Sequence, residues 1–191
     1  MAAVTGIPGT GRRPTPLSVG VVVWLASELM FFSGLFAAYF TLRATDAVWP
    51  PPDVDLATGR TAIATVILIA SSFTMHLASR AASENRRTNA VQWLAITALM
   101  GVAFLSNQVL EYAEAPFSIS SHAYGSIFYL MTGFHGLHVI GGLLFMVAVS
   151  AAILGRTSRA PAHSTLEVCA FYWHFVDVVW VAMFLTIYVL Q

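Results

Sequence analysis

The chain has 191 residues, and its nine acidic and nine basic side chains give a formal net charge of zero. Hydrophobic residues make up 58% of it and charged residues only 9%, against roughly 25% in an ordinary soluble domain. The mean hydropathy is +0.75. This composition excludes a water-soluble globular domain, and the lack of a basic stripe argues against nucleic acid as a partner. The chain is therefore expected to be a polytopic membrane protein.

Residues 1–16 are rich in Gly, Pro and Thr, which predicts a flexible cytoplasmic tail ahead of one membrane domain over residues 17–191. Five apolar windows in that domain are each long enough to cross a bilayer. They predict helices at Leu17–Leu42, Thr61–Ser79, Asn89–Glu111, Ala123–Leu154 and Val168–Leu190. Backbone polar groups in hydrocarbon must be satisfied within their own segment, so the expected fold class is all-α, a five-helix transmembrane bundle.

The distribution of arginines predicts the orientation of this bundle. With the N-terminus in the cytoplasm, the inner side holds seven arginines and the outer side only Arg43 and Arg60. The seven inner ones are Arg12, Arg13, Arg80, Arg86, Arg87, Arg156 and Arg159. Because cytoplasmic loops carry the excess of basic residues, the N-terminus is predicted to lie inside and the C-terminus outside.

Two predicted helices carry a carboxylate deep in the membrane. Glu28 lies roughly 16 Å and Asp177 roughly 13 Å from the inner end of its helix, by a rise of about 1.5 Å per residue. His174 is one turn before Asp177 and shares its face. Because a lone charge is costly there, we expect Glu28, His174 and Asp177 to turn inward and satisfy one another or a trapped water, with at least one carboxyl protonated. A static clamp and a proton-related role are the two alternatives.

The fourth predicted helix contains GFHGLHVIGG, with His135 and His138 on one face and Gly141 and Gly142 after them. Such glycines let a neighbouring helix approach closely. Two histidines with nearby acids would also suit a di-metal site, but Glu111 lies roughly 16 Å above Glu28, too far to join it. We therefore expect packing histidines that are hydrogen-bonded to their neighbours, and no metal site.

Glu111 is the last residue of the third predicted helix, and Glu114 follows it at the start of an outer loop. The sequence places no arginine close to them. They are expected to form a locally acidic patch there, or an ordinary solvated loop.

Four stretches of the chain together resemble subunit III of the haem-copper oxidases, and specifically of cytochrome c oxidase. They are SELMFF (27–32), WPP (49–51), the block from EYAEAPFSIS to GFHGLHVIGG (111–142) and YWHFVDVVW (172–180). The resemblance covers all of the chain except the tail and the second helix. Members of this family commonly have seven helices, and this chain is similar to the short form that lacks the first two.

The resemblance implies a subunit without a redox centre, packed beside oxidase subunits I and II, which hold the haems and copper. Glu28 matches the family's intramembrane carboxylate and Asp177 the acidic position of the WHFVDVVW helix. The implied role is to support stability, a phospholipid-holding cleft and sustained proton uptake of a translocating oxidase in the cell membrane. Membrane lipids are expected partners, and a respiratory supercomplex is a further candidate.

Other functions fit parts of the same pattern. Subunit III of a quinol oxidase would share the fold, although the EYAEAPF block favours the cytochrome c type. A free-standing proton or solute transporter could use Glu28 and Asp177 as a relay. Such transporters usually show repeat symmetry or broken helices, and neither is visible in this sequence. A purely structural assembly subunit is the third alternative.

Overall fold

The structure, a computed structural model, describes residues 16–155 and 162–190 and contains five long helices there. They are α1 (Pro16–Thr45), α2 (Thr58–Ser83), α3 (Arg87–Glu114), α4 (Ala123–Leu154) and α5 (Ala162–Phe184), with a π-helical turn η1 (Leu185–Val189) continuing α5. No strand occurs in these ranges. The predicted all-α fold with five membrane helices is confirmed, and most ends extend by a few residues. The predicted tail, apart from Pro16 at the start of α1, and the arginines at 12, 13, 156 and 159 lie outside the described residues.

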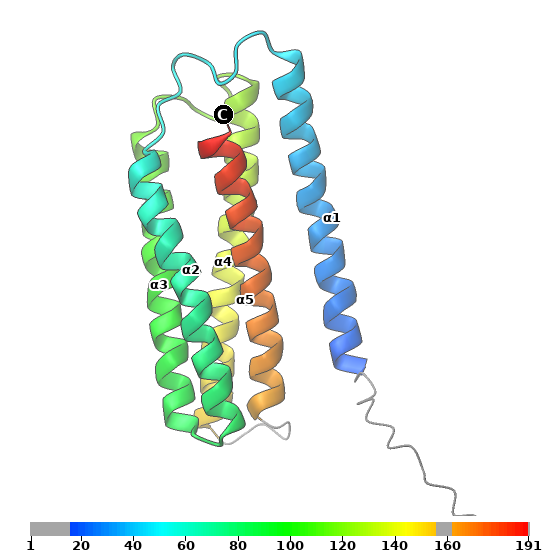
Figure 1. The fold of residues 1–191 in the computed structure, drawn as a ribbon, viewed down its shortest axis with the longest axis vertical. Helices are drawn as coiled ribbons and strands as arrows, with labels where there is room; N and C mark the ends of the chain where they lie inside the picture. The colour runs from blue at the N-terminus through cyan, green and yellow to red at the C-terminus, as the bar shows by residue number, and fades with distance from the viewer. Residues whose placement is uncertain (1–15, 156–161, 191) are drawn as a thin grey trace, which may run out of the picture.

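The helices stand side by side and alternate in direction (Figure 1). α1, α3 and α5 run one way, and α2 and α4 the other. α2 to α5 pack closely as a four-helix group, whereas α1 lies beside that group and contacts chiefly α4 and α5. The described chain therefore begins and ends at opposite ends of the bundle, as an odd number of crossings requires.

The outer surface of the bundle is apolar. Each of the five helices is long and apolar enough to cross a bilayer. Large side chains such as Met30, which is 76% exposed, cover the outside of α1. So large a contiguous apolar surface is unfavourable in water and is favourable in contact with lipid tails. The protein is a multi-pass membrane protein.

Residues that disfavour a helix separate the five spans. Three prolines, Pro50 to Pro52, interrupt the chain between α1 and α2, and Pro116 follows the end of α3. Trp49 in the first of these loops donates a hydrogen bond from Nε1 to the Tyr39 hydroxyl at 3.1 Å. Its ring also meets Tyr124 edge-on at 5.0 Å, so the loop is tied to both α1 and α4.

A tight turn joins α2 to α3. Asn85 has a φ of 57°, which few residues other than Gly, Asn and Asp adopt readily. The N–H groups of Asn85 and Arg86 donate back to carbonyls in the last turn of α2, the pairing of a Schellman cap. Beside them, hydrogen bonds from Arg80 and Arg86 lower the pKa of the exposed Glu84 carboxyl.

The bundle interior is built around two tryptophans of α5, both fully buried. The Trp173 indole donates to Ser71 Oγ and the Trp180 indole to Thr65 Oγ1, each at 2.9 Å. A Cβ atom added at Gly142 would lie 2.8 Å from the Trp173 ring. Because Gly142 on α4 has no side chain, the Trp173 ring can pack directly against the α4 backbone. The two indole N–H groups donate to acceptors on α2.

Candidate functional site

Asp177 lies near the middle of α5 and is bound to α2. Its Oδ2 accepts a short hydrogen bond from Ser72 Oγ, and the same hydroxyl lies 2.8 Å from His174 Nδ1. Because a hydroxyl has one proton and donates it to Asp177, it accepts at its other side, so Nδ1 of His174 carries the hydrogen. The chain His174 to Ser72 to Asp177 thus joins two helices inside the membrane.

The second oxygen of this carboxylate is not satisfied. Asp177 is only 5% exposed, and its Oδ1 has no hydrogen-bond partner among the described residues. The residue Asp177 also lines a groove of about 270 Å³ between α2 and α5. The groove is lined by Ile69, Ser72, His174, Asp177, Val178 and Val181. A buried carboxylate oxygen without a donor is costly. The groove is a candidate binding site because three polar residues line it within an otherwise apolar segment.

Glu28 has a different partner. Its Oε2 lies 3.1 Å from Nε2 of His138, in the middle of α4, and both side chains are largely buried. His138 Nδ1 lies 2.7 Å from the Phe134 carbonyl oxygen, which can only accept, so Nδ1 carries a hydrogen. The contact with Glu28 then needs one more proton, on the carboxyl or on Nε2. In either form the pair has no net charge.

The predicted cluster of Glu28, His174 and Asp177 does not form, and that prediction is corrected. Each carboxylate has a separate partner, His138 for Glu28 and Ser72 for Asp177. The physical reason is the placement of α1, which packs beside α4 and α5 rather than against α2. The similar depth of the two carboxylates does not by itself bring them together.

The two histidines of α4 point toward different neighbours. His138 contacts α1, whereas His135 packs between the rings of Phe104 at 5.8 Å and Trp180 at 5.0 Å. Both ring nitrogens of His135 are buried without a hydrogen-bond partner among the described residues. The expectation of a shared face with hydrogen bonds to neighbours is therefore wrong for His135. A spacing of three residues separates two side chains by about 60° around a helix axis, which here is enough to divide them between neighbours.

Close packing along α4 involves the two predicted glycines. Gly142 lies against Trp173, as described above, and a Cβ added at Gly141 would lie 3.1 Å from the Tyr172 hydroxyl. That hydroxyl donates to the His138 carbonyl oxygen at 2.8 Å. The ring of Tyr172 also stacks on Trp24 of α1 at 5.3 Å. Small residues on α4 thus admit the aromatic groups that connect α4, α5 and α1 around the Glu28 pair.

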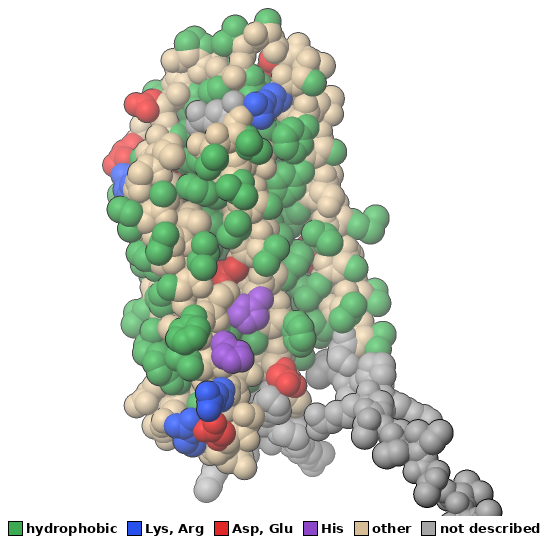
Figure 2. Space-filling view, in the orientation of Figure 1, with side chains coloured by type: hydrophobic (Ala, Val, Ile, Leu, Met, Phe, Trp, Pro, Cys, Tyr) green, Lys and Arg blue, Asp and Glu red, His purple; other side chains and the backbone are tan. Residues whose placement is uncertain are grey.

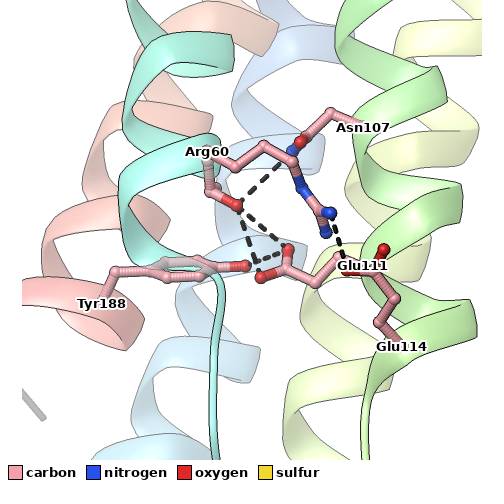
Figure 3. Close-up of polar contacts among 6 residues, drawn as sticks. Arg60, Asn107, Glu111, Glu114 and Tyr188 are labelled. Carbon is pink, nitrogen blue, oxygen red and sulfur yellow. Dashed lines mark hydrogen bonds and ion pairs between the residues drawn. The ribbon is translucent and has the colours of Figure 1, made fainter.

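A third buried carboxylate lies near the far end of the bundle (Figure 3). Glu111 is 3% exposed, and its Oε2 accepts a hydrogen bond of 2.6 Å from the Tyr188 hydroxyl in η1. Thr61 of α2 donates to the same carboxylate, at 3.3 Å to Oε1. Asn107 in turn donates to the Thr61 hydroxyl. This cluster connects α2, α3 and the π-helical turn.

The predicted acidic patch at Glu111 and Glu114 is also corrected. α3 continues past its predicted end at Glu111, so Glu114 lies in its last turn rather than in a loop, and Glu111 is buried. Glu114 forms an ion pair of 2.6 Å with Arg60 of α2 (Figure 3). Arg60 is 54 residues before Glu114 in the sequence, so this ion pair forms only when α2 packs against α3.

Sequence reasoning missed several of these partners. Ser72 and Tyr188 carry no signal that separates them from other polar residues in apolar helices. His138 could have been found, because it lies at the middle of its helix and so at the depth of Glu28. Among the described residues, no three His, Cys, Asp or Glu side chains lie close enough together to hold a metal ion. The two histidines near the carboxylates each have one separate side-chain partner, Glu28 for His138 and Ser72 for His174.

Comparison with known proteins assigns the chain to a family. It matches the family described as cytochrome c oxidase subunit III over residues 10–191. A protein of Mycobacterium bovis named probable cytochrome c oxidase subunit 3 is 44% identical over 204 residues, which cover 100% of both chains. One of Nocardia farcinica with the same name is also 44% identical, over 98% of each chain. A Synechocystis protein named cytochrome c oxidase subunit 3 is 40% identical over 95% of this chain and 79% of its own. The chain belongs to the cytochrome c oxidase subunit III family.

Proposed function

We propose that this protein is the non-redox subunit III of a proton-pumping cytochrome c oxidase of aerobic respiration. It packs beside the catalytic subunit and, with that subunit and subunit II, forms the oxidase in the cell membrane. The haems and copper belong to those partners. The observation that carries this proposal is the match to the family over nearly the whole chain, together with relatives that bear that name at full length.

The polar groups inside the membrane fit a supporting role. His138 is bound to Glu28, His174 to Ser72, and His135 is enclosed by aromatic rings. Axial ligation of a haem would need a ring nitrogen that faces a large open pocket. The geometry instead favours pairs that hold helices together without net charge, which suits a subunit that stabilises its neighbours and sustains their proton uptake.

The orientation and the lipid partner belong to the same proposal. The N-terminus lies in the cytoplasm and the C-terminus outside, because the basic residues of the α2–α3 turn are retained on the cytoplasmic side. Phospholipid occupies the apolar sides of α1, which packs against the rest of the bundle mainly through α4 and α5. Lipid in that position would support the weakly packed α1.

A free-standing transporter is the second candidate function. It is favoured by one observation, the carboxylates Glu28 and Asp177 near the middle of the membrane. They belong to separate pairs: the pair of Glu28 joins α1 to α4, and the pair of Asp177 joins α5 to α2. A relay would need a direct connection between them, so this candidate is the weaker one.

Purification of the tagged chain in mild detergent tests the proposal. We expect haem absorbance and two larger subunits to co-purify with it. In cells that lack the chain, the first turnovers of the oxidase should be normal, because no cofactor ligand is lost, whereas activity should decay early during sustained turnover. Purification of the chain without haem, or loss of the haem spectrum from an otherwise assembled core on its deletion, would contradict the proposal.

A further inference from the structure

The start of α4 is capped by a histidine. His122 is the residue before the helix, and its Nδ1 lies 2.8 Å from the backbone nitrogen of Gly125. Serine, threonine, aspartate and asparagine are the usual residues at this position, because their side-chain oxygens accept from the same N–H group. The N–H of Gly125 can only donate, so Nδ1 of His122 accepts and carries no hydrogen. The cap therefore requires an uncharged ring with its hydrogen on Nε2.

The capped N–H lies under the loop between α3 and α4. Gly125 is buried, and a Cβ atom added there would lie 2.5 Å from the Ser118 carbonyl oxygen and 3.3 Å from the Phe117 ring. The first N–H groups of a helix have no carbonyl of a preceding turn to bind, so they depend on a cap or on water. Because Gly125 is buried, its N–H depends on His122.

The other ring nitrogen of His122 faces the loop between α1 and α2. Nε2 lies 3.4 Å from Oδ2 of Asp53, with 20% of the histidine side chain and 53% of the aspartate side chain exposed. The ring also lies beside Phe117, with centroids 5.4 Å apart, and Tyr124, at 6.1 Å. Asp53 is thus the charged group against the ring, and Tyr124 is a phenol, which stays neutral at physiological pH. One histidine therefore connects the loops at this end of the bundle to the first turn of α4.

This end of the bundle is accessible to the aqueous medium. Charged side chains are exposed there, above the apolar middle of the surface (Figure 2). Histidine is the side chain whose charge ordinarily changes between about pH 5 and pH 8, so the pH on this side of the membrane can alter it. In the proposed orientation this is the outer side, to which a proton-pumping oxidase releases protons.

Protonation of His122 and the cap exclude each other. A second hydrogen on the ring occupies Nδ1, the atom that accepts from Gly125, and an imidazolium ring has no acceptor. Protonation also strengthens the contact with Asp53, but ion pairs with exposed carboxylates contribute little. Loss of the cap costs more, because it leaves a buried N–H without an acceptor. The proton therefore weakens the start of α4 more than the ion pair compensates.

From this geometry we infer that His122 is a pH-sensitive cap of α4. When the ring is neutral, the cap is closed and the loops at this end are held to the first turn of the helix. When the ring takes up its second proton, the N–H of Gly125 loses its acceptor and the first turn opens more often. This inference goes beyond the proposed function, on which it rests only for the side of the membrane whose pH matters.

Hydrogen exchange of the oxidase purified through its tagged subunit III tests this inference. Mass spectrometry follows the exchange from about pH 8 to about pH 5 in peptides that contain the first turn of α4, with rates corrected for the chemical effect of pH. His122→Asn is the matched variant, because asparagine caps a helix through an oxygen that does not titrate. We expect the protection of this turn to fall several-fold with acid in the native chain and to stay constant in His122→Asn. Peptides from the α2–α3 turn report any general effect of acid.

Two outcomes would overturn the inference. The first is unchanged protection of the native chain over this pH range, which needs no variant. The second is an equal loss of protection in the native chain and in His122→Asn, because the proton would then act elsewhere.

A second variant separates the cap from the ion pair. Asp53→Asn keeps the cap and removes the charged partner, so we expect it to retain the pH dependence of the native chain. Loss of that dependence would mean that the proton acts through the ion pair, which contradicts the inference. Protection is measured in the tagged chain whether or not haem co-purifies with it, so a failure of the proposed function is observed separately.

Discussion

Individual carboxylates in this bundle are stabilised in three different ways. Glu28 shares a proton with His138, Asp177 accepts from a serine hydroxyl, and Glu111 accepts from Tyr188 and Thr61. In each case the partner is on another helix, so the polar contact also fixes how two helices pack. These contacts matter for the stability of the bundle because removal of one partner leaves the other buried and unsatisfied, which is costly.

Substitution of Asp177 separates hydrogen bonding from charge. Asp177→Asn keeps an oxygen that can accept from Ser72, so the assembled oxidase should retain its thermal stability. Asp177→Leu leaves Ser72 and His174 without this partner and should destabilise the subunit by about 1–3 kcal/mol, measured by thermal unfolding of the purified complex. An equal loss from both variants would show that the ionised carboxylate itself is required.

The Asn variant and Glu28→Gln together distinguish the two roles proposed for these carboxylates. Normal assembly with full sustained turnover in both would establish a structural clamp. Normal assembly with early decay of turnover would support a proton-related role.

The Glu28–His138 pair is tested by a double-mutant cycle. Glu28→Leu and His138→Leu each leave one polar group alone in the membrane, whereas the double variant removes both. We expect the double variant to be more stable than the sum of the single effects predicts, with a coupling energy of about 0.5–3 kcal/mol. Thermal unfolding of the four purified complexes measures this energy. Strictly additive effects would mean that the pair does not interact.

At the scale of helices, packing depends on where small residues admit large ones. Trp173 of α5 lies between Gly142 of α4 and Gly101 of α3, and an added Cβ at either glycine would approach its ring to 2.8 Å. The ring is rigid and its indole is held by Ser71, so it has little freedom to move away. These contacts fix the spacing of three helices.

Gly142→Ala tests this spacing, with Gly34→Ala on α1 as the control. The first substitution forces a methyl group against the Trp173 ring and should cost about 1–3 kcal/mol in stability. An added Cβ at Gly34 meets no atom within 4 Å, so that variant should be neutral or slightly more stable because alanine favours a helix. Thermal unfolding of both variants checks this difference, and equal stabilities would contradict the packing described here.

The whole molecule divides into a closely packed group, α2 to α5, and a more separate α1 (Figure 1). The C-terminal part of α1 is joined to η1 and to the residue after it. Tyr39 donates to the Thr186 carbonyl oxygen and Arg43 to that of Leu190. Further along, the Glu28–His138 pair joins α1 to α4. Polar contacts at two levels therefore attach a helix that buries little of its own apolar surface.

The orientation of the whole molecule is tested with reporter fusions. An enzyme that folds only outside the cytoplasm should be active when fused after Gln191 and inactive when inserted in the α2–α3 turn, because the arginines of that turn are retained inside. Activity in the opposite pattern would reverse the orientation. Activity at both positions would contradict the odd number of crossings between them and the alternating directions of the helices.

The sequence by itself determined the class of the protein, its five spans and its family. Apolar windows define membrane helices because each span must satisfy its own backbone, so no long-range contact is needed to recognise it. Helical rise likewise placed Glu28 and Asp177 at similar depth. The motifs around WHFVDVVW and GFHGLHVIGG indicated the family, which the full-length comparison confirmed.

Only the tertiary structure decided which partner each polar residue takes. Depth follows from position along one helix, but the rotation of each helix about its axis and its choice of neighbours follow from packing between helices. For that reason Glu28 meets His138 instead of His174, and Glu114 meets Arg60 although the two are far apart in the sequence. Asp177 meets Ser72 of α2. The two tryptophans one turn before and after it pack in the interior, against Gly142 of α4 and the hydroxyls of Ser71 and Thr65 of α2.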